Sequence, residues 1–258
     1  MIGHLAQPFC IKYILHYRTN ASIIMKRNIY KPIQFLFVIA IAVLLLTACD
    51  KEDDNYSIGD FIVSFGVVEK APDTSEGNYL IRLDDGNRFS TIATPVNSGE
   101  IKAGQRVFVN FAPYEDQINP DNSKTIFGKI NLIQSILFKE VIQVNSAIND
   151  SIGNDPIQVK DTWVTGDSIL TVGFNFFTEG SVHYINLVDN GEGNGIQKPF
   201  VFEFRHHARG DQQIYKASGY VSFNLNKYRL AGQHKVDFYL RYTDYAGRRI
   251  DLPHSISY

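Results

Sequence analysis

Strand-length apolar segments separated by turn-forming residues run along most of this chain, from Ile58 to Leu252. Aromatic and β-branched side chains alternate with polar ones in these segments, and Gly, Asn and Asp recur between them. A period of two places successive side chains on opposite faces of a strand, as in a half-buried sheet. The sequence therefore predicts an all-β fold.

The first half of this β region, 57–145, has the pattern of a small barrel. The expected strands are Ile58–Lys70, Tyr79–Leu83, Arg88–Pro95, Arg106–Ala112 and Thr125–Val141. Between the second and third, Asp85-Gly86 supplies the positive φ angles of a tight hairpin. Five short strands with long first and last members are typical of a closed barrel of the OB type.

The second half, 146–258, has the pattern of a sandwich. Asn145–Pro156 is dense in Asn, Asp, Ser, Gly and Pro, which predicts a domain boundary there. The strands expected beyond it are Gln158–Val164, Ile169–Phe177, Val182–Val188, Phe200–His207, Ile214–Leu225, Lys235–Tyr242 and Arg248–Leu252. In the fourth of these, Phe200, Phe202 and Phe204 alternate with other residues, which predicts a core face opposite a wet face. Short strands with no amphipathic helix between them favour an antiparallel β-sandwich.

The N-terminal part of the chain carries the elements of an export signal. Basic Lys26 and Arg27 precede Phe35–Leu46, a run of twelve apolar residues. Twelve residues are too few for a helix that crosses a bilayer, which takes about 20. We therefore interpret 1–48 as a signal peptide, with Met25 as the expected start of translation.

The signal peptide is expected to end before a cysteine. Leu46-Thr47-Ala48-Cys49 resembles the lipobox of bacterial lipoproteins, which implies that Cys49 begins the mature protein and carries its lipid anchor to the outer membrane. The other cysteine, Cys10, falls in the signal peptide. The mature chain therefore has no cysteine pair, and its fold must be held without a disulfide.

A short acidic segment, 49–56, follows the cleavage site, and we expect it to be a solvated tether. Lys51-Glu52-Asp53-Asp54 resembles an export signal. Certain Gram-negative surface lipoproteins carry such a signal just after the lipidated cysteine. That resemblance implies exposure on the outside of the cell. The alternative is a spacer that carries no signal.

The charge of the chain argues against nucleic acid as a partner. Met1–Ala48 holds five basic residues and no acidic one, so its removal lowers the formal net charge from −2 to −7. The barrel segment Ser57–Asn145 carries eight basic residues against eleven acidic ones. Neither the mature chain nor its barrel segment has the excess of basic residues that binding to phosphate groups requires.

Several segments, taken in order, resemble the NigD-like lipoprotein family. Tyr79–Phe89 and Ile101–Phe111 look like its N-terminal OB domain, whereas Trp163–Val188, Phe202–His207 and Val221–Leu225 look like its C-terminal sandwich. One departure is His207, where we expect asparagine. The family has no established catalytic residues to carry over. Its name comes from association with a bacteriocin operon, and the resemblance therefore implies a role in immunity.

Enzyme signatures are absent from the sequence, which has no nucleophile elbow, zincin motif or Walker loop. Gly191–Gly195 lies between two expected strands, and we interpret it as a mobile hairpin loop. Asp189, Glu192 and Asn194 offer oxygen ligands, but their spacing does not fit a calcium-binding EF-hand. We therefore expect no catalytic residue, no cofactor and no metal.

We expect the histidines and one adhesion-like tripeptide to have structural roles and not functional ones. Adjacent His206 and His207 face opposite sides of a strand, so they cannot easily share one metal. We expect His206, and His183 likewise, to form hydrogen bonds at the end of the core. Arg209-Gly210-Asp211 spells an adhesion motif, but we interpret it as an ordinary turn.

The leading hypothesis is a non-enzymatic lipoprotein of the cell envelope that binds a protein or a glycan. In its family-derived form the protein gives bacteriocin immunity, by sequestering the toxin or by masking its receptor. The alternative is a glycan-binding or accessory component of a surface nutrient-uptake system, and a third possibility is an envelope scaffold. A groove on the barrel would need stacking aromatics, for which Tyr79 and Phe89 are available.

Overall fold

The computed structural model describes residues 61–71, 78–93, 101–145 and 148–258, which belong to one compact unit that spans 55–258. The expected signal peptide and tether, with Cys49 and Lys51-Glu52-Asp53-Asp54, lie outside the described residues. No helix within the described ranges has the length and apolarity to cross a membrane.

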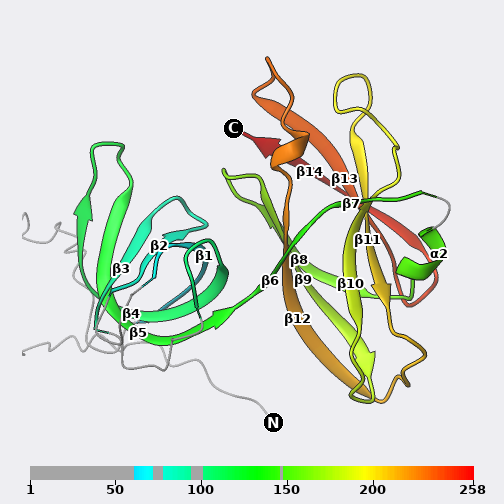
Figure 1. The fold of residues 1–258 in the computed structure, drawn as a ribbon, viewed down its shortest axis with the longest axis horizontal. Helices are drawn as coiled ribbons and strands as arrows, with labels where there is room; N and C mark the ends of the chain where they lie inside the picture. The colour runs from blue at the N-terminus through cyan, green and yellow to red at the C-terminus, as the bar shows by residue number, and fades with distance from the viewer. Residues whose placement is uncertain (1–60, 72–77, 94–100, 146–147) are drawn as a thin grey trace, which may run out of the picture. The chain divides into compact units, whose positions relative to one another are not determined.

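The N-terminal domain is a closed five-stranded barrel, as predicted (Figure 1). Its strands are β1 (Ile62–Lys70), β2 (Leu80–Leu83), β3 (Arg88–Ala93), β4 (Arg106–Ile118) and β5 (Lys124–Ser135). Their order around the barrel is β1-β2-β3-β5-β4. The β3–β5 pair is parallel and the other pairs are antiparallel, which closes the sheet without a free edge.

Alternation along the strands fills the interior of the barrel. Val107, Val109 and Phe111 of β4 are fully buried, and the ring of Phe89 from β3 stacks on Phe111 with centroids 4.0 Å apart. Gly128 lets β5 approach β4 closely, because a Cβ atom there would lie 2.3 Å from the carbonyl oxygen of Ala112. The closed barrel thus depends on packed aromatics and on a close backbone contact at Gly128.

The C-terminal domain is a sandwich of a five-stranded and a four-stranded sheet. Its elements are β6 (Leu137–Glu140), β7 (Ile142–Gln143), α2 (Asn149–Ile152), β8 (Gln158–Val164), β9 (Ile169–Thr178), β10 (Tyr184–Asp189), β11 (Phe200–His207), β12 (Tyr215–Asn224), the 3₁₀ helix η1 (Asn226–Tyr228), β13 (Lys235–Thr243) and β14 (Arg249–Ser257). The strand orders are β14-β13-β11-β10-β7 and β6-β12-β9-β8. The sandwich is confirmed, although the β6–β12, β7–β10 and β11–β13 pairs are parallel.

The predicted single strand Thr125–Val141 is wrong. The barrel strand β5 ends at Ser135, where the backbone N–H of Ile136 donates to the carbonyl oxygen of Arg106 at 2.8 Å. The chain then supplies β6 to the four-stranded sheet and β7 to the five-stranded sheet. An uninterrupted apolar run hides this change of partner, because apolar residues suit the barrel and the sandwich equally.

The segment Asn145–Pro156, where we expected the domain boundary, contributes α2 and one bridge to the sandwich. Asp155 pairs with His206 of β11, and the N–H of Ile157 donates to the carbonyl oxygen of Thr243 at 2.9 Å. The described part of this segment is therefore bound to the five-stranded sheet. The turn-forming residues of Asn145–Pro156 therefore lie within the second domain and not at its boundary with the barrel.

The core of the sandwich contains Phe202 and Phe204, as the alternation predicted. The opposite face of β11 differs from the expected wet face, because Val201 and Glu203 are each only 8% exposed. The β10–β11 loop folds back toward this face: the N–H of Val201 donates to the carbonyl oxygen of Glu192 at 3.1 Å. A strand can thus be buried on both faces when a loop covers one of them.

Candidate functional site

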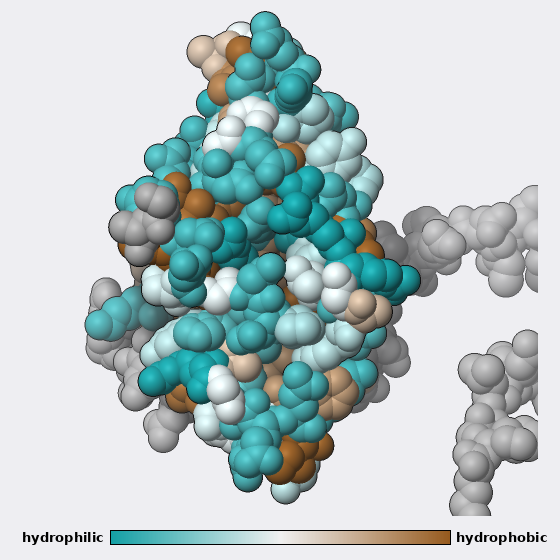
Figure 2. Space-filling model, turned by 90° about the vertical axis from the view of Figure 1, so that its right-hand side faces the viewer, coloured by the Kyte–Doolittle hydropathy of each residue, from teal (hydrophilic) through white to brown (hydrophobic). Residues whose placement is uncertain are grey.

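The candidate site lies on the outer face of the five-stranded sheet, the face away from the sandwich core. Two rows of side chains cross strands β11, β13 and β14 there, as their register defines. The charged row consists of Glu203, Arg241 and Asp251, and the apolar row consists of Val201, Tyr239 and Pro253. Figure 2 shows this side of the molecule, where hydrophilic residues predominate and apolar groups are small and separate.

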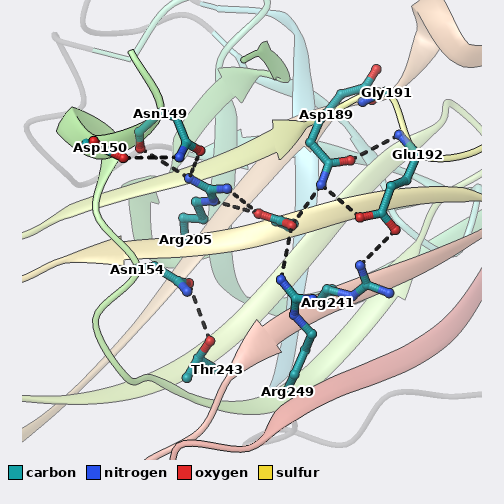
Figure 3. Close-up of polar contacts among 12 residues, drawn as sticks. Asn149, Asp150, Asn154, Asp189, Gly191, Glu192, Arg205, Arg241, Thr243 and Arg249 are labelled. Carbon is teal, nitrogen blue, oxygen red and sulfur yellow. Dashed lines mark hydrogen bonds and ion pairs between the residues drawn. The ribbon is translucent and has the colours of Figure 1, made fainter. Parts of the chain in front are cut away.

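Arg241 holds two carboxylates in the charged row. Its guanidinium donates to both oxygens of Asp251, at 2.7 and 2.9 Å. It also donates to Glu192 Oε2 at 2.9 Å, as Figure 3 shows. These hydrogen bonds hold the pKa of both carboxyl groups below their usual values and raise the pKa of Arg241. Both carboxylates are therefore ionised at neutral pH, and that of Asp251 is held in a bidentate pair.

Glu203 extends this network toward α2. Its carboxylate accepts hydrogen bonds from Asn190 Nδ2 at 2.9 Å and from Arg205 Nε at 2.7 Å, and Arg249 lies 3.9 Å away. Arg205 in turn donates to Asn149 Oδ1 at 2.8 Å (Figure 3). The network thus fixes the two segments that border this face, the β10–β11 loop and α2.

The β10–β11 loop has a shape determined by its own hydrogen bonds. Asn194 Oδ1 accepts from the N–H groups of Ile196, Gln197 and Lys198 at 2.9 to 3.3 Å. Gly193 has a φ of +82°, and a Cβ atom there would lie 2.0 Å from the carbonyl oxygen of Pro199. Gly191–Gly195 lies in the loop between β10 and β11, as predicted. Hydrogen bonds within the loop brace it, and its expected mobility stays a prediction.

Between this loop and the sheet lies a hollow, here called the groove, of about 450 Å³. The residues that line it are Glu192, Gly193, Lys198, Pro199, Val201, Tyr239, Arg241 and Asp251. Tyr239 is 39% exposed and offers an aromatic ring beside the charged row. The lining carries two cationic and two anionic groups, so its formal charge is balanced.

A second polar cluster joins His183, His206 and Asp211. His206 is 2% exposed, and its Nδ1 lies 3.0 Å from the carbonyl oxygen of Pro156. Its Nε2 lies 2.7 Å from His183 Nδ1, and His183 Nε2 lies 2.9 Å from Asp211 Oδ2. The prediction that both histidines form hydrogen bonds at the end of the core is confirmed.

The acceptors at its two ends orient this cluster. The carbonyl oxygen of Pro156 and the carboxylate of Asp211 both accept, so His206 Nδ1 and His183 Nε2 donate to them, and the two remaining ring nitrogens meet in the bond between the rings. Bonds from Thr178 and His183 hold the pKa of Asp211 well below its usual value, which keeps it ionised. Every ring nitrogen of the pair is therefore engaged in a hydrogen bond, and none is left to act as a general base.

The adhesion motif and the metal candidate also have structural outcomes. The side chain of Asp211 is 3% exposed and accepts from the N–H of Glu179 at 2.9 Å, so the tripeptide does not present its carboxylate to solvent. Asp189 accepts from the hydroxyl of Tyr228 at 2.8 Å and Glu192 pairs with Arg241, so both carboxylates already have protein partners. Among the described residues no cluster of His, Cys, Asp and Glu has the arrangement of a metal site.

The two barrel aromatics considered for stacking, Tyr79 and Phe89, are not available for it. Tyr79 is 1% exposed and Phe89 is fully buried, since both side chains belong to the barrel core. The suggestion of a barrel groove built on these rings is therefore wrong. An exposed ring lies instead on the sandwich, at Tyr239.

Sequence reasoning did not identify Tyr239, Arg241 or Asp251 as site residues. The alternation in Lys235–Tyr242 does place Tyr239 and Arg241 on one face, which was a usable signal. Their approach to the β10–β11 loop follows from the parallel pairing of β11 with β13, and no local pattern reveals that pairing.

The barrel and the sandwich, with a charge-balanced groove on the outer sheet, define a two-domain all-β protein. Comparison with protein families gives the same division. The model described as the NigD-like N-terminal OB domain matches 66–136, and that of the NigD-like C-terminal beta sandwich domain matches 140–252. The chain belongs to the NigD-like family.

Solved structures with this fold come from Parabacteroides and Bacteroides species. A protein from Parabacteroides distasonis, whose name relates it to a toxin, is 28% identical, with a TM-score of 0.61 over 76% of this chain and 93% of its own. A protein of unknown function from Bacteroides vulgatus is 24% identical, with a TM-score of 0.61 over 77% and 91%. A NigD-like immunity protein from Bacteroides caccae is 20% identical, with a TM-score of 0.56 over 76% and 94%. Comparison with curated proteins finds no match.

Proposed function

We propose that this protein is a non-enzymatic, lipid-anchored binding protein of the outer membrane, whose ligand occupies the groove. The observation that carries the proposal is the groove itself. Its loop is braced by Asn194, its carboxylates are fixed by Arg241, and its aromatic ring is exposed. A surface that is already ordered before a ligand arrives loses little conformational entropy on binding.

The physiological role that we propose is bacteriocin immunity. Membership of the NigD-like family supports it, and a solved relative from Bacteroides caccae bears the name of an immunity protein. Protection follows if the protein sequesters the toxin or masks its receptor. Both routes require binding and no bond-breaking step, in agreement with a histidine cluster whose ring nitrogens are all engaged.

Deletion of the gene, followed by challenge with culture supernatant of a competing strain, tests this role. Deletion is expected to raise sensitivity, and the wild-type gene is expected to restore protection. Tyr239→Ala should fail to restore it, whereas Tyr215→Ala, an equally drastic change at a 65% exposed tyrosine of β12, should succeed. Unaltered sensitivity after deletion contradicts immunity.

The location in the cell has its own test. Acyl chains at Cys49 stabilise membrane attachment by about 0.8 kcal/mol per buried CH₂ group, so neither domain is needed for anchoring. Cys49→Ala should release the protein from the membrane fraction. Replacement of Lys51-Glu52-Asp53-Asp54 by alanine should leave lipidation intact but remove protease accessibility on whole cells. Unchanged accessibility contradicts the export signal.

A second candidate function is a glycan-binding component of a surface nutrient-uptake system, and the exposed ring of Tyr239 favours it. Neighbouring polysaccharide-utilisation genes would support this function, whereas a neighbouring gene for a small secreted peptide and its exporter would support immunity. Growth of the deletion strain and the wild type on single polysaccharides tests this nutrient-uptake function directly. Equal growth of the two strains on every polysaccharide contradicts it.

A further inference from the structure

The floor of the groove is apolar and aromatic. The register places Tyr239 between Val201 of β11 and Pro253 of β14. Val201 is 8% exposed and Tyr239 is 39% exposed, so the ring is the part of the floor that a ligand meets. An aromatic face packs well against a flat array of C–H groups, such as one side of a sugar ring.

The wall of the groove consists of hydrogen-bond acceptors in fixed positions. The Asp251 oxygens each accept one bond from Arg241, and Glu192 accepts from Arg241 and from Asn190 Nδ2 at 3.2 Å. A carboxylate has about four acceptor sites, so both groups can accept further bonds. The side chains of Asp251 and Glu192 are 38% and 49% exposed, which leaves those sites open to hydroxyl donors.

The charge of the groove favours a neutral ligand. Lys198 and Arg241 balance Glu192 and Asp251, so the lining has no net charge with which to attract a polyanion or a polycation. Ligand hydroxyls can still accept from Lys198 and donate to the carboxylates. Many hydroxyls without net charge are the property of neutral sugars.

The size of the groove favours a small ligand. Its volume of about 450 Å³ lies within the range of small-molecule sites, roughly 300–1,000 Å³. A stable protein partner would instead need about 800 Å² of surface on each side. A short saccharide meets the requirements of shape, charge and size together.

We propose that the groove binds a neutral saccharide, with one sugar ring on Tyr239 and its hydroxyl groups bonded to Asp251 and Glu192. This proposal rests on the proposed function that the groove is the ligand site. Within the immunity role, it favours masking of a surface glycan receptor over capture of the toxin.

Binding of oligosaccharides to the purified full-length lipoprotein tests the proposal. The detergent must lack a sugar headgroup, and the probes are neutral gluco-, manno- and galacto-oligosaccharides beside anionic oligogalacturonate. We expect binding of at least one neutral probe and none of oligogalacturonate. Tyr239→Ala should weaken it at least about tenfold, which corresponds to about 1.4 kcal/mol.

Matched variants separate the ring from its hydroxyl and from general damage. Tyr239→Phe keeps the aromatic face and should bind within about threefold of wild type, because stacking requires only the ring. Tyr215→Ala should bind like wild type, since Tyr215 lies on the other sheet. Equal melting temperatures of the variants show that the fold is intact.

Three results would overturn the proposal: no neutral probe binds, oligogalacturonate binds as tightly as the neutral probes, or Tyr239→Ala binds like wild type. The immunity test distinguishes this failure from failure of the proposed function. If Tyr239→Ala abolishes protection although no saccharide binds, the groove remains the ligand site and only the ligand class is wrong. If Tyr239→Ala affects neither protection nor binding, the groove is not the site.

Discussion

Arg106 of the barrel donates a hydrogen bond of 3.1 Å from its Nε to the hydroxyl of Ser222 in the sandwich. The same guanidinium pairs with Asp84 and donates to Thr171 Oγ1 at 3.0 Å, and Trp163 donates to Asp84 Oδ2 at 2.6 Å. The side chain of Arg106 is 1% exposed. The two domains therefore share a buried ion pair whose donors and acceptors are satisfied from both sides.

Arg106→Met should lower the free energy of unfolding by about 3–5 kcal/mol, because it leaves the Asp84 carboxylate without its cation. Denaturant titration measures the loss. The double variant Arg106→Met with Asp84→Asn should recover about 1 kcal/mol or more, since it removes the unpaired charge. Arg248→Ala, at a side chain 72% exposed, is the control and should change stability by less than about 0.5 kcal/mol. A single variant as stable as the control contradicts the role of Arg106.

The histidine cluster predicts a loss of stability in mild acid. Burial lowers the pKa of His206, although its hydrogen bond to Pro156 and the nearby charge of Asp155 oppose this. The folded state thus binds fewer protons at His206 than the unfolded chain does. The stabilising contribution is complete above the unfolded pKa of about 6.5 and is lost as the pH falls below it.

Unfolding measured between pH 7 and pH 5 should therefore show a slope of up to about 1.4 kcal/mol per pH unit from this group. His206→Gln should reduce the slope, because glutamine can bond to Pro156 but does not titrate. His234→Gln, at an exposed position, should leave the slope unchanged. Equal slopes in all three proteins would show that His206 is not responsible.

Gly128→Ala should destabilise the barrel by about 1–3 kcal/mol, because the added methyl group meets backbone that cannot yield easily. The Cβ atom would lie 2.3 Å from the carbonyl oxygen of Ala112. Gly166→Ala is a matched control, since no atom lies within 4 Å of a Cβ built there. Thermal unfolding of both variants measures the difference, and equal melting temperatures contradict a close approach of β4 and β5.

Gly193→Ala should disorder the groove loop, because its φ is +82° and its Cβ atom would meet the carbonyl oxygen of Pro199. We expect faster proteolysis within the β10–β11 loop and weaker ligand binding, with little change in global stability. Gly191 also has a φ of +82°, but no atom lies within 4 Å of a Cβ atom built there. Gly191→Ala therefore adds backbone strain without a steric collision. Cleavage at the same rate in both variants contradicts the collision.

The sequence predicts those parts of the fold that are encoded locally. The hairpin at Gly86 and the buried alternation of Phe202 and Phe204 follow from turn chemistry and from a period of two. The end of β5 at Ser135 does not, since apolarity continues past it while the pairing partner changes.

The groove is harder to predict, because its residues come from separate strands. Arg241 reaches Asp251 through an antiparallel pair and lies beside Glu203 through a parallel pair. Charged residues on adjacent strands can combine in several registers, and only the tertiary fold selects one. Arg106 shows the same limit, since nothing local marks one arginine for burial.

Pro253 lies in the middle of β14, the edge strand of the five-stranded sheet. Proline has no backbone N–H, so this edge cannot form a continuous ladder with a strand of another molecule. Lipid anchoring, as proposed, would crowd many copies into two dimensions, where an open edge invites aggregation. The residue that borders the ring of Tyr239 would thus also keep neighbouring copies apart and their grooves unobstructed.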